Sequence, residues 1–231
     1  MTRSRTTRFV ILGLTGVLTA FVLSACQVHP GAAAVVGDQE ISTQRVDAVA
    51  QALCSANRGA SQSGQPASDL PSRGARQGAL RVLIDSALAE QFGQAKGVHP
   101  DQEQVSAALA QNAEGISALP AGEQEAFRAA LKEYAEGQLM VIEAGRQSLI
   151  AQGKSSPTDE EALAEGEKLR TAFAKDIEVD VDPRYGTYSN GNLRAASGSL
   201  SIPVSARAFD GQSSDPSAAW VASLPTAQKC R

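Results

Sequence analysis

The sequence predicts a mainly α-helical domain with a small β element, in which a strand near the N-terminus pairs with a strand near the C-terminus. Aromatic residues are only 4% of the 231 residues and alanine is abundant, a composition that suits closely packed helices better than a β-sandwich. Apolar residues recur every three to four positions over most of the region 42–173, which is the helical period. At 177–182 they alternate with period two, as in a strand.

The first elements are a short strand and a helix. Residues 35–36 are predicted to form the strand, and residues 37–38 a tight turn. Ser42 can then cap a helix that ends near Asn57. Its inward face consists of residues at helical spacing, namely Val46, Val49, Leu53 and Cys54.

A loop and two helices follow. Residues 58–71 are rich in Ser, Gly, Gln and Pro and are predicted to be a flexible loop. A longer helix is expected over 72–96, with Gly97 as its C-terminal stop. A short helix then begins at Pro100, with Val105 facing inward. The inward face of the longer helix comprises Ala79, Leu80, Leu83, Ile84, Ala87, Leu88 and Phe92.

The longest helical pattern runs from 120 to about 152. Gly137 and Gly145 within it are predicted either to bend the helix or to allow close contact with another one. Thr158, with Glu161 three residues later, has the capping-box pattern of a further helix start.

The C-terminal part is predicted to be mostly irregular. The strand at 177–182 is expected to pair with the first strand, and Leu200, Ile202 and Val204 indicate another short strand. The end of the chain, from Gly211, is expected to be a poorly ordered tail unless Cys230 ties it down.

The N-terminus has the pattern of a lipoprotein signal peptide. Arg3, Arg5 and Arg8 precede an apolar run over 9–23, which is shorter than the about 20 residues of a membrane span. The run ends in Leu-Ser-Ala-Cys, which resembles the bacterial lipobox. We therefore expect cleavage before Cys26 and a lipid on its thiol; an uncleaved anchor helix is the alternative.

These features predict the organisation of the whole chain. A lipoprotein signal peptide (1–25) is followed by a lipid-anchored linker (26–32), the helical domain (33–193) and a C-terminal extension or tail (194–231). The predicted location is the extracytoplasmic face of the cell membrane, where the lipid holds the protein. The net charge of −4 gives no basic footprint for nucleic acid.

Besides Cys26 the chain has two cysteines. An even number in an exported protein favours a disulfide between Cys54 and Cys230, and two free thiols are the alternative. The histidines, His29 and His99, have no ligand spacing with a cysteine. We therefore expect neither a metal site nor a cofactor.

The sequence carries no recognisable active-site motif, such as a Gly-rich phosphate loop, a G-x-S-x-G turn or a Cys/His cluster. His99 is interpreted as a helix-start residue rather than a catalytic base. The acidic residues over 159–165 are interpreted as the solvated first turns of a helix rather than a metal site. We therefore expect a protein that is not an enzyme.

Phe127, Tyr134 and Phe173 lie on the predicted helices at positions that allow two interpretations. As an aromatic stripe at helical spacing they are most simply core residues. Alternatively, they are candidates for binding unfolded client proteins in a groove between helices.

Three motifs, taken in order, resemble one family. The first strand and helix carry Val36, Gly37, Ile41 and Ser42, and the start of the short helix carries Gly97, Val98, Asp101, Glu103 and Val105. Residues 179–188 read Val-Asp-Val-Asp-Pro-Arg-Tyr-Gly-Thr-Tyr, with Tyr188 where tryptophan is commoner. This order is similar to that of the SurA N-terminal-like domain in SurA/PrsA-type extracytoplasmic chaperones, and it covers about 33–193.

The resemblance implies a helical module that acts as a holdase or folding helper for unfolded exported proteins. Complete foldases of this type insert a parvulin-type prolyl isomerase domain before the final strand, whereas here Phe173 leads directly into Ile177. Isomerase activity is therefore not implied. The alternative function is a non-enzymatic envelope lipoprotein that binds one dedicated protein partner or has a structural role.

Overall fold

The computed structural model describes residues 30–62, 70–189, 191–194, 202–213 and 216–230. These residues are mainly α-helical, with two small antiparallel sheets, as the sequence predicts. Those from Gly31 onward form one compact unit. Cys26 and the predicted signal peptide lie outside the described residues. In the part of the chain that is described, no helix is both long and apolar enough to cross a membrane.

The main sheet confirms the predicted pairing of an early strand with a late one. Strand β1 (Ala32–Val36) lies between β2 (Gln39–Ser42) and β3 (Val179–Val181), antiparallel to both. Val36 faces Val179, and the amide of Gly37 donates to the carbonyl of Glu178 at 2.8 Å. Gly37 has φ 59°, which the turn between β1 and β2 requires and which glycine adopts without strain.

Helices α1 (Thr43–Gln62) and α2 (Ser72–Lys96) follow the sheet. Ser42 caps α1, because its Oγ accepts the amide of Arg45 at 3.2 Å. The prediction that α1 ends near Asn57 is wrong: the helix continues to Gln62, so the start of the predicted loop 58–71 is helical. No proline interrupts this stretch, and each added residue gains a backbone hydrogen bond. Residues 63–69 of that predicted loop lie outside the described residues.

The predicted bounds of α2 are confirmed. Gly97 follows it in the left-handed conformation with φ 66°, and its amide donates to the carbonyl of Gln94 at 3.1 Å. The predicted inward face of α2 is buried throughout, from Ala79 to Phe92. It packs against α1, α5 and the sheet.

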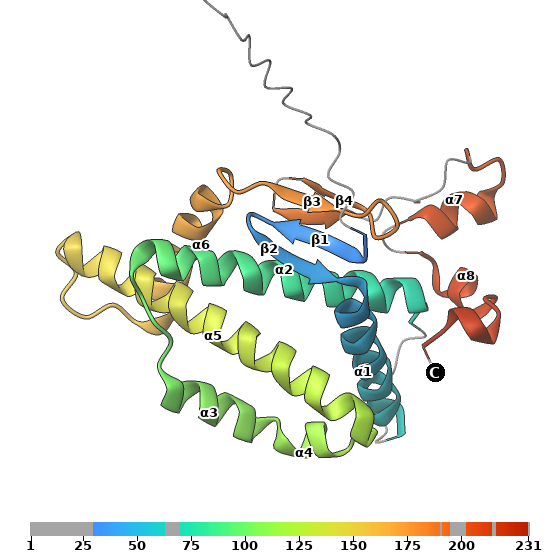
Figure 1. Cartoon of the computed structure of the whole chain (residues 1–231), viewed down its shortest axis with the longest axis horizontal. Coiled ribbons are helices and arrows are strands. Elements are labelled where there is room, and N and C mark those ends of the chain that lie inside the picture. Colours follow the sequence, from blue (N-terminus) through green and yellow to red (C-terminus); the bar gives the residue numbers. More distant parts are fainter. Residues whose placement is uncertain (1–29, 63–69, 190, 195–201, 214–215, 231) are drawn as a thin grey trace, which may run out of the picture. The chain divides into compact units, whose positions relative to one another are not determined.

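Helices α3 (Gln102–Gln111) and α4 (Ala113–Ser117) lead into the longest helix, α5 (Ala121–Ala151). The carboxylate of Asp101 caps α3 by accepting the amide of Glu103 at 2.9 Å. α5 lies between α2 on one side and α3 and α4 on the other, while the main sheet lies along α2 (Figure 1). α5 is therefore the central helix of the bundle.

Helix α6 (Asp159–Phe173) packs closely along α5. The predicted capping box is present, since the amide of Thr158 donates to the Glu161 carboxylate at 3.0 Å and Thr158 Oγ1 accepts the amide of Glu161. Hydrogen bonds from Lys154 and Thr158 lower the pKa of Glu161 to about 2, so this carboxylate keeps its charge well into the acid range.

The contact between α5 and α6 depends on two glycines. A Cβ atom at Gly145 would overlap the carbonyl oxygen of Ala162, and one at Gly166 would overlap the carbonyl oxygen of Val141. Of the two roles predicted for Gly145, the structure therefore shows close helix contact.

The C-terminal part contains more regular structure than predicted. A hairpin of β4 (Thr187–Ser189) and β5 (Asn192–Arg194) is followed by α7 (Ala206–Gln212), α8 (Ala218–Ala222) and the 3₁₀ turn η1 (Thr226–Gln228). The expected strand around Ile202 and Val204 is wrong, because both are irregular and almost fully exposed; its third residue, Leu200, lies outside the described residues. Pro203 between them lacks the amide proton that a ladder needs.

Cys54 and Cys230 form a disulfide with their Cα atoms 4.9 Å apart, which is the pairing that the sequence favours. A backbone hydrogen bond beside the disulfide also connects the C-terminal segment to the residues before α2, since the amide of Cys230 donates to the carbonyl of Leu70 at 2.8 Å. Residue 230 is thereby held against α1 and the start of α2.

Candidate functional site

A groove of about 480 Å³ lies between α3 and α5, and we call it the α3–α5 groove. Alanine, leucine and tyrosine side chains form its apolar part, and asparagine and glutamine form its polar part. The lining residues are Gln104, Ala107, Ala108, Gln111 and Asn112 from α3 and the residue after it, and Leu131, Tyr134, Ala135, Gln138 and Leu139 from α5.

The sequence explains why this surface is hollow. On α3 the lining residues recur every three to four positions, so they share one face of the helix. Two of them, Ala107 and Ala108, have side chains too short to fill the space in front of α5. Val105 is only 2% exposed and holds α3 in place, because its burial removes apolar surface from water.

The α3–α5 groove has the chemistry of a site for uncharged chain segments. Apart from the phenol of Tyr134, none of its lining side chains is ionisable. Primary amides both donate and accept hydrogen bonds, as the backbone of an unfolded polypeptide does. The volume falls within the range of about 300–1,000 Å³ that is usual for ligand sites.

The structure separates the three predicted client-binding residues. Tyr134 lines the α3–α5 groove and is 43% exposed. Phe127 is half-buried on the same helix, four residues before Leu131, and so lies along the same face. Phe173 instead packs on the ring of Phe92, with the ring centroids 5.7 Å apart, and belongs to the core between α2, α5 and α6.

The α3 wall of the groove was missed from the sequence. Gln104, Ala107, Ala108 and Gln111 follow helical spacing, but alanine and glutamine are also ordinary residues of an exposed helix face. The signal that could have predicted the groove is the pair of small residues, Ala107 and Ala108, on a short helix next to a helix with larger apolar residues.

Two other cavities have charged linings. One, of about 600 Å³, lies between α6, β3 and the β4–β5 hairpin and includes Arg170, Lys175 and Tyr188. Nearby, burial raises the pKa of Asp85, which lies 3.9 Å from the guanidinium of Arg170. The other, of about 430 Å³, adjoins the disulfide and includes Glu123.

The residues considered for catalysis or metal binding in the sequence lie at helix starts, and two of the carboxylates form ion pairs. His99 is exposed before α3. Of the acidic residues that open α6, Asp159 pairs with Arg146 at 2.5 Å and Glu161 pairs with Lys154. Within the described ranges no group of three or more His, Cys, Asp or Glu residues is placed to hold a metal ion.

Comparison with known proteins gives one family. The model of the SurA-like N-terminal domain matches residues 1–153, which extend from the start of the chain past the end of α5. No curated protein and no solved structure matches significantly. Because the family model covers well over half of the 231 residues, the chain belongs to the family of proteins with a SurA-like N-terminal domain.

Proposed function

We propose that this protein is a chaperone-like lipoprotein, which binds unfolded segments of exported proteins in the α3–α5 groove and has no enzymatic activity. The family supports a chaperone-like role, and both walls of the groove, α3 and α5, lie within the matched residues. The observation that carries the proposal is the lining: apolar side chains flanked by uncharged amides. Such a surface binds apolar side chains and backbone without demanding a particular sequence.

The size of the groove fits short stretches of an unfolded chain. At about 480 Å³ it holds a few side chains, so affinity for one segment would be modest and exchange rapid. A holdase benefits from both properties, because it must release its client. Tyr134 provides the largest exposed apolar surface in the groove and is the residue to test first.

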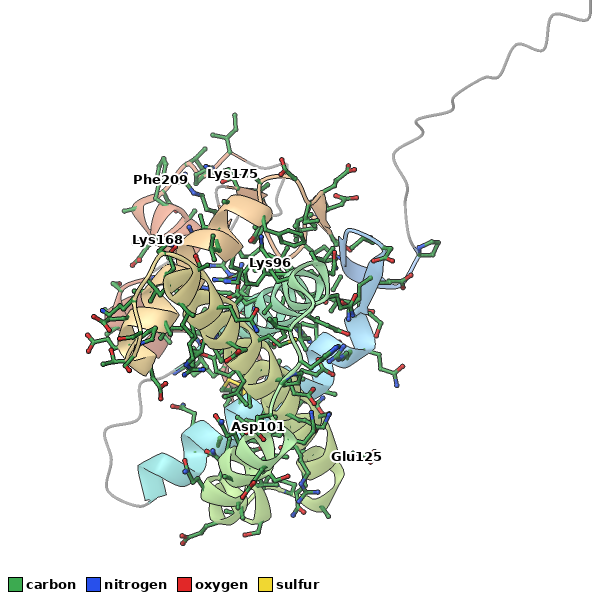
Figure 2. The ribbon with its side chains drawn as sticks, turned by 90° about the vertical axis from the view of Figure 1, so that its left-hand side faces the viewer. Lys96, Asp101, Glu125, Lys168, Lys175 and Phe209 are labelled. Atoms are coloured by element: carbon green, nitrogen blue, oxygen red, sulfur yellow. A yellow bond between two sulfur atoms is a disulfide. The ribbon has the colours of Figure 1, made fainter. Side chains whose placement is uncertain are left out.

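The first experiment uses the chain from residue 26 with Cys26→Ser, and follows light scattering of a chemically unfolded secreted protein. Suppression of aggregation is expected near stoichiometric ratios. Tyr134→Asp places an unpaired charge in an apolar site and should raise the required molar ratio several-fold, whereas Tyr134→Phe should behave as the unchanged protein. Phe209→Asp is the matched control, since Phe209 (labelled in Figure 2) is 62% exposed on α7 and does not line the groove.

Equal suppression by the Tyr134→Asp and Phe209→Asp proteins would contradict the assignment of the groove. If the unchanged protein scatters like an inert acidic control protein, the holdase proposal fails. The function would then be the binding of one dedicated envelope partner, to be sought by crosslinking in cells.

The membrane anchor is the second part of the proposal. It is supported by the arginines, the apolar run and the sequence Leu-Ser-Ala-Cys that ends at Cys26. In cells fed radiolabelled palmitate, the protein should carry label and sediment with membranes. Cys26→Ser should abolish the label and leave the uncleaved precursor; equal labelling of the two proteins would show that Cys26 is not the lipidated residue.

A further inference from the structure

A further, smaller site lies on the opposite side of α5 from the α3–α5 groove. It is a cavity of about 230 Å³, bounded by α2, α5 and residues 98–100, and we call it the acidic cavity. Its lining residues are Ser86, Glu90 and Gln94 of α2, Val98, His99 and Pro100, and Glu133, Glu136 and Met140 of α5.

The acidic cavity and the α3–α5 groove use opposite faces of α5. Successive residues of an α-helix are turned by about 100°, so Glu133, Glu136 and Met140 project roughly opposite to Leu131 and Gln138. A substitution in one site therefore leaves the lining of the other unchanged, which allows the two sites to be tested separately.

The carboxylates of the acidic cavity are unequally neutralised. Glu133 pairs with Arg45, and Glu136 accepts a hydrogen bond from Lys132 at 2.6 Å. Glu90 has only the amide of Gln94, at 3.3 Å, and no cation within ion-pair distance among the described residues. The cavity thus keeps one uncompensated negative charge at the side formed by α2.

A buried hydroxyl in the same wall also lacks a partner. Ser86 is only 5% exposed, yet its Oγ has no hydrogen-bond partner among the described residues. Serine within a helix commonly donates back to the carbonyl four residues earlier, which here is Val82. Here that bond is not made, and the Oγ lone pairs are also unused, so they can accept a hydrogen bond from a donor that enters the cavity. Ser86 and Glu90, four residues apart on α2, lie on the same face of the helix.

We propose that the acidic cavity binds the side chain of a lysine or arginine in an unfolded client, an inference that rests on the proposed function. The ammonium or guanidinium group donates to Ser86 Oγ and the Glu90 carboxylate. Its methylene stem lies along the buried side chains of Val98 and Met140.

The volume of the cavity and the acceptor groups in its wall favour the cationic end of one side chain over other ligands. The volume of about 230 Å³ is below the about 300–1,000 Å³ of sites for whole small molecules, and so suits a single side chain. Among the described residues, the carboxylates and His99 of the cavity do not form a group that could hold a metal ion. The client is therefore recognised at two places: apolar segments in the α3–α5 groove and a basic residue in the acidic cavity.

The test compares two fluorescein-labelled peptides with the same apolar segment, flanked in one by lysine and in the other by the uncharged analogue norleucine. Binding to the chain from residue 26 with Cys26→Ser is followed by fluorescence anisotropy. We expect the lysine peptide to bind about tenfold more tightly at low ionic strength, and this advantage to shrink in salt.

Variants of the cavity should remove that advantage without weakening the binding of the norleucine peptide. Glu90→Gln removes the charge, and Ser86→Ala removes the acceptor; each should reduce the ratio of the two affinities to less than about twofold. Thermal melting followed by circular dichroism checks that both variants fold. Glu125→Gln, at an exposed carboxylate near the start of α5 (Figure 2), is the matched control and should keep the full ratio.

The outcomes separate this inference from the proposed function. If both peptides bind equally to the unchanged protein, or if Glu90→Gln keeps the lysine preference, the acidic cavity is not a cation site while client binding stands. If neither peptide binds, the proposed function and this inference both fail.

Discussion

Replacing Cys54 and Cys230 together by serine should lower the free energy of unfolding by about 2–5 kcal/mol. The cysteines are 176 residues apart, so their bond closes a loop that includes most of the described chain. A cross-link over such a loop restricts the unfolded ensemble strongly, and the chain-entropy estimate is at the upper end of that range. Urea unfolding of the chain from residue 26 with Cys26→Ser, in both forms, measures the difference.

Accessibility to thiol reagents gives an independent check of the same bond. Without prior reduction, the native or urea-unfolded protein should incorporate no iodoacetamide at Cys54 or Cys230, and after reduction both should react in urea. Alkylation of either cysteine in the unreduced protein would show that the disulfide is absent. The double serine variant should still fold, because Cys54 packs in a core of α1, α2 and sheet residues that the substitution leaves otherwise intact.

Gly145→Ala should destabilise the protein by about 2 kcal/mol or more, although alanine is the better helix former. In an unhindered helix the exchange gains about 1 kcal/mol. At Gly145 the added methyl would overlap the carbonyl oxygen of Ala162, and backbone cannot rotate out of the way as a side chain can. α5 and α6 would have to move apart, and overpacking of this kind typically costs about 1–3 kcal/mol and occasionally more. Urea unfolding measures the change.

Gly78→Ala in α2 is the matched control for this prediction. Gly78 is exposed within the helix, and a Cβ atom there would meet nothing within 4 Å. The same substitution should therefore stabilise the protein by about 0.5–1 kcal/mol. If alanine at Gly145 proves as harmless as alanine at Gly78, the helices are not in backbone contact at that point.

Local sequence signals predicted the elements whose ends are determined by single residues. Gly97 ends α2 because it adopts the left-handed conformation, and Thr158 with Glu161 begins α6 because each caps the other's backbone amide. The pairing of β1 with β3 was also predictable, since alternating valines at 179 and 181 need a partner strand to bury them.

Other features depend on tertiary contacts that the sequence does not display. α1 extends beyond Asn57 into a stretch whose Gly, Ser and Gln content predicted a loop. Ile202 and Val204 alternate as in a strand, yet no neighbouring strand pairs with them in the described part of the chain. Of the aromatic residues that allowed two interpretations, Tyr134 lines the α3–α5 groove, whereas Phe173 packs on Phe92. Spacing alone does not tell which neighbour a helix face meets.

The attachment of α3 determines how the groove can respond to its occupants. Among the side chains of α3 only Val105 is buried, and α4 adds Ile116. Detaching α3 while Ile116 stays packed exposes one valine and costs roughly 1.5–3 kcal/mol, well below the about 5–15 kcal/mol of unfolding a whole domain. Local opening of this wall should therefore precede opening of α2 or α5, with Gly97 as one pivot. A site with one rigid and one yielding wall can adjust its aperture, and so accept bulky and small side chains at similar cost.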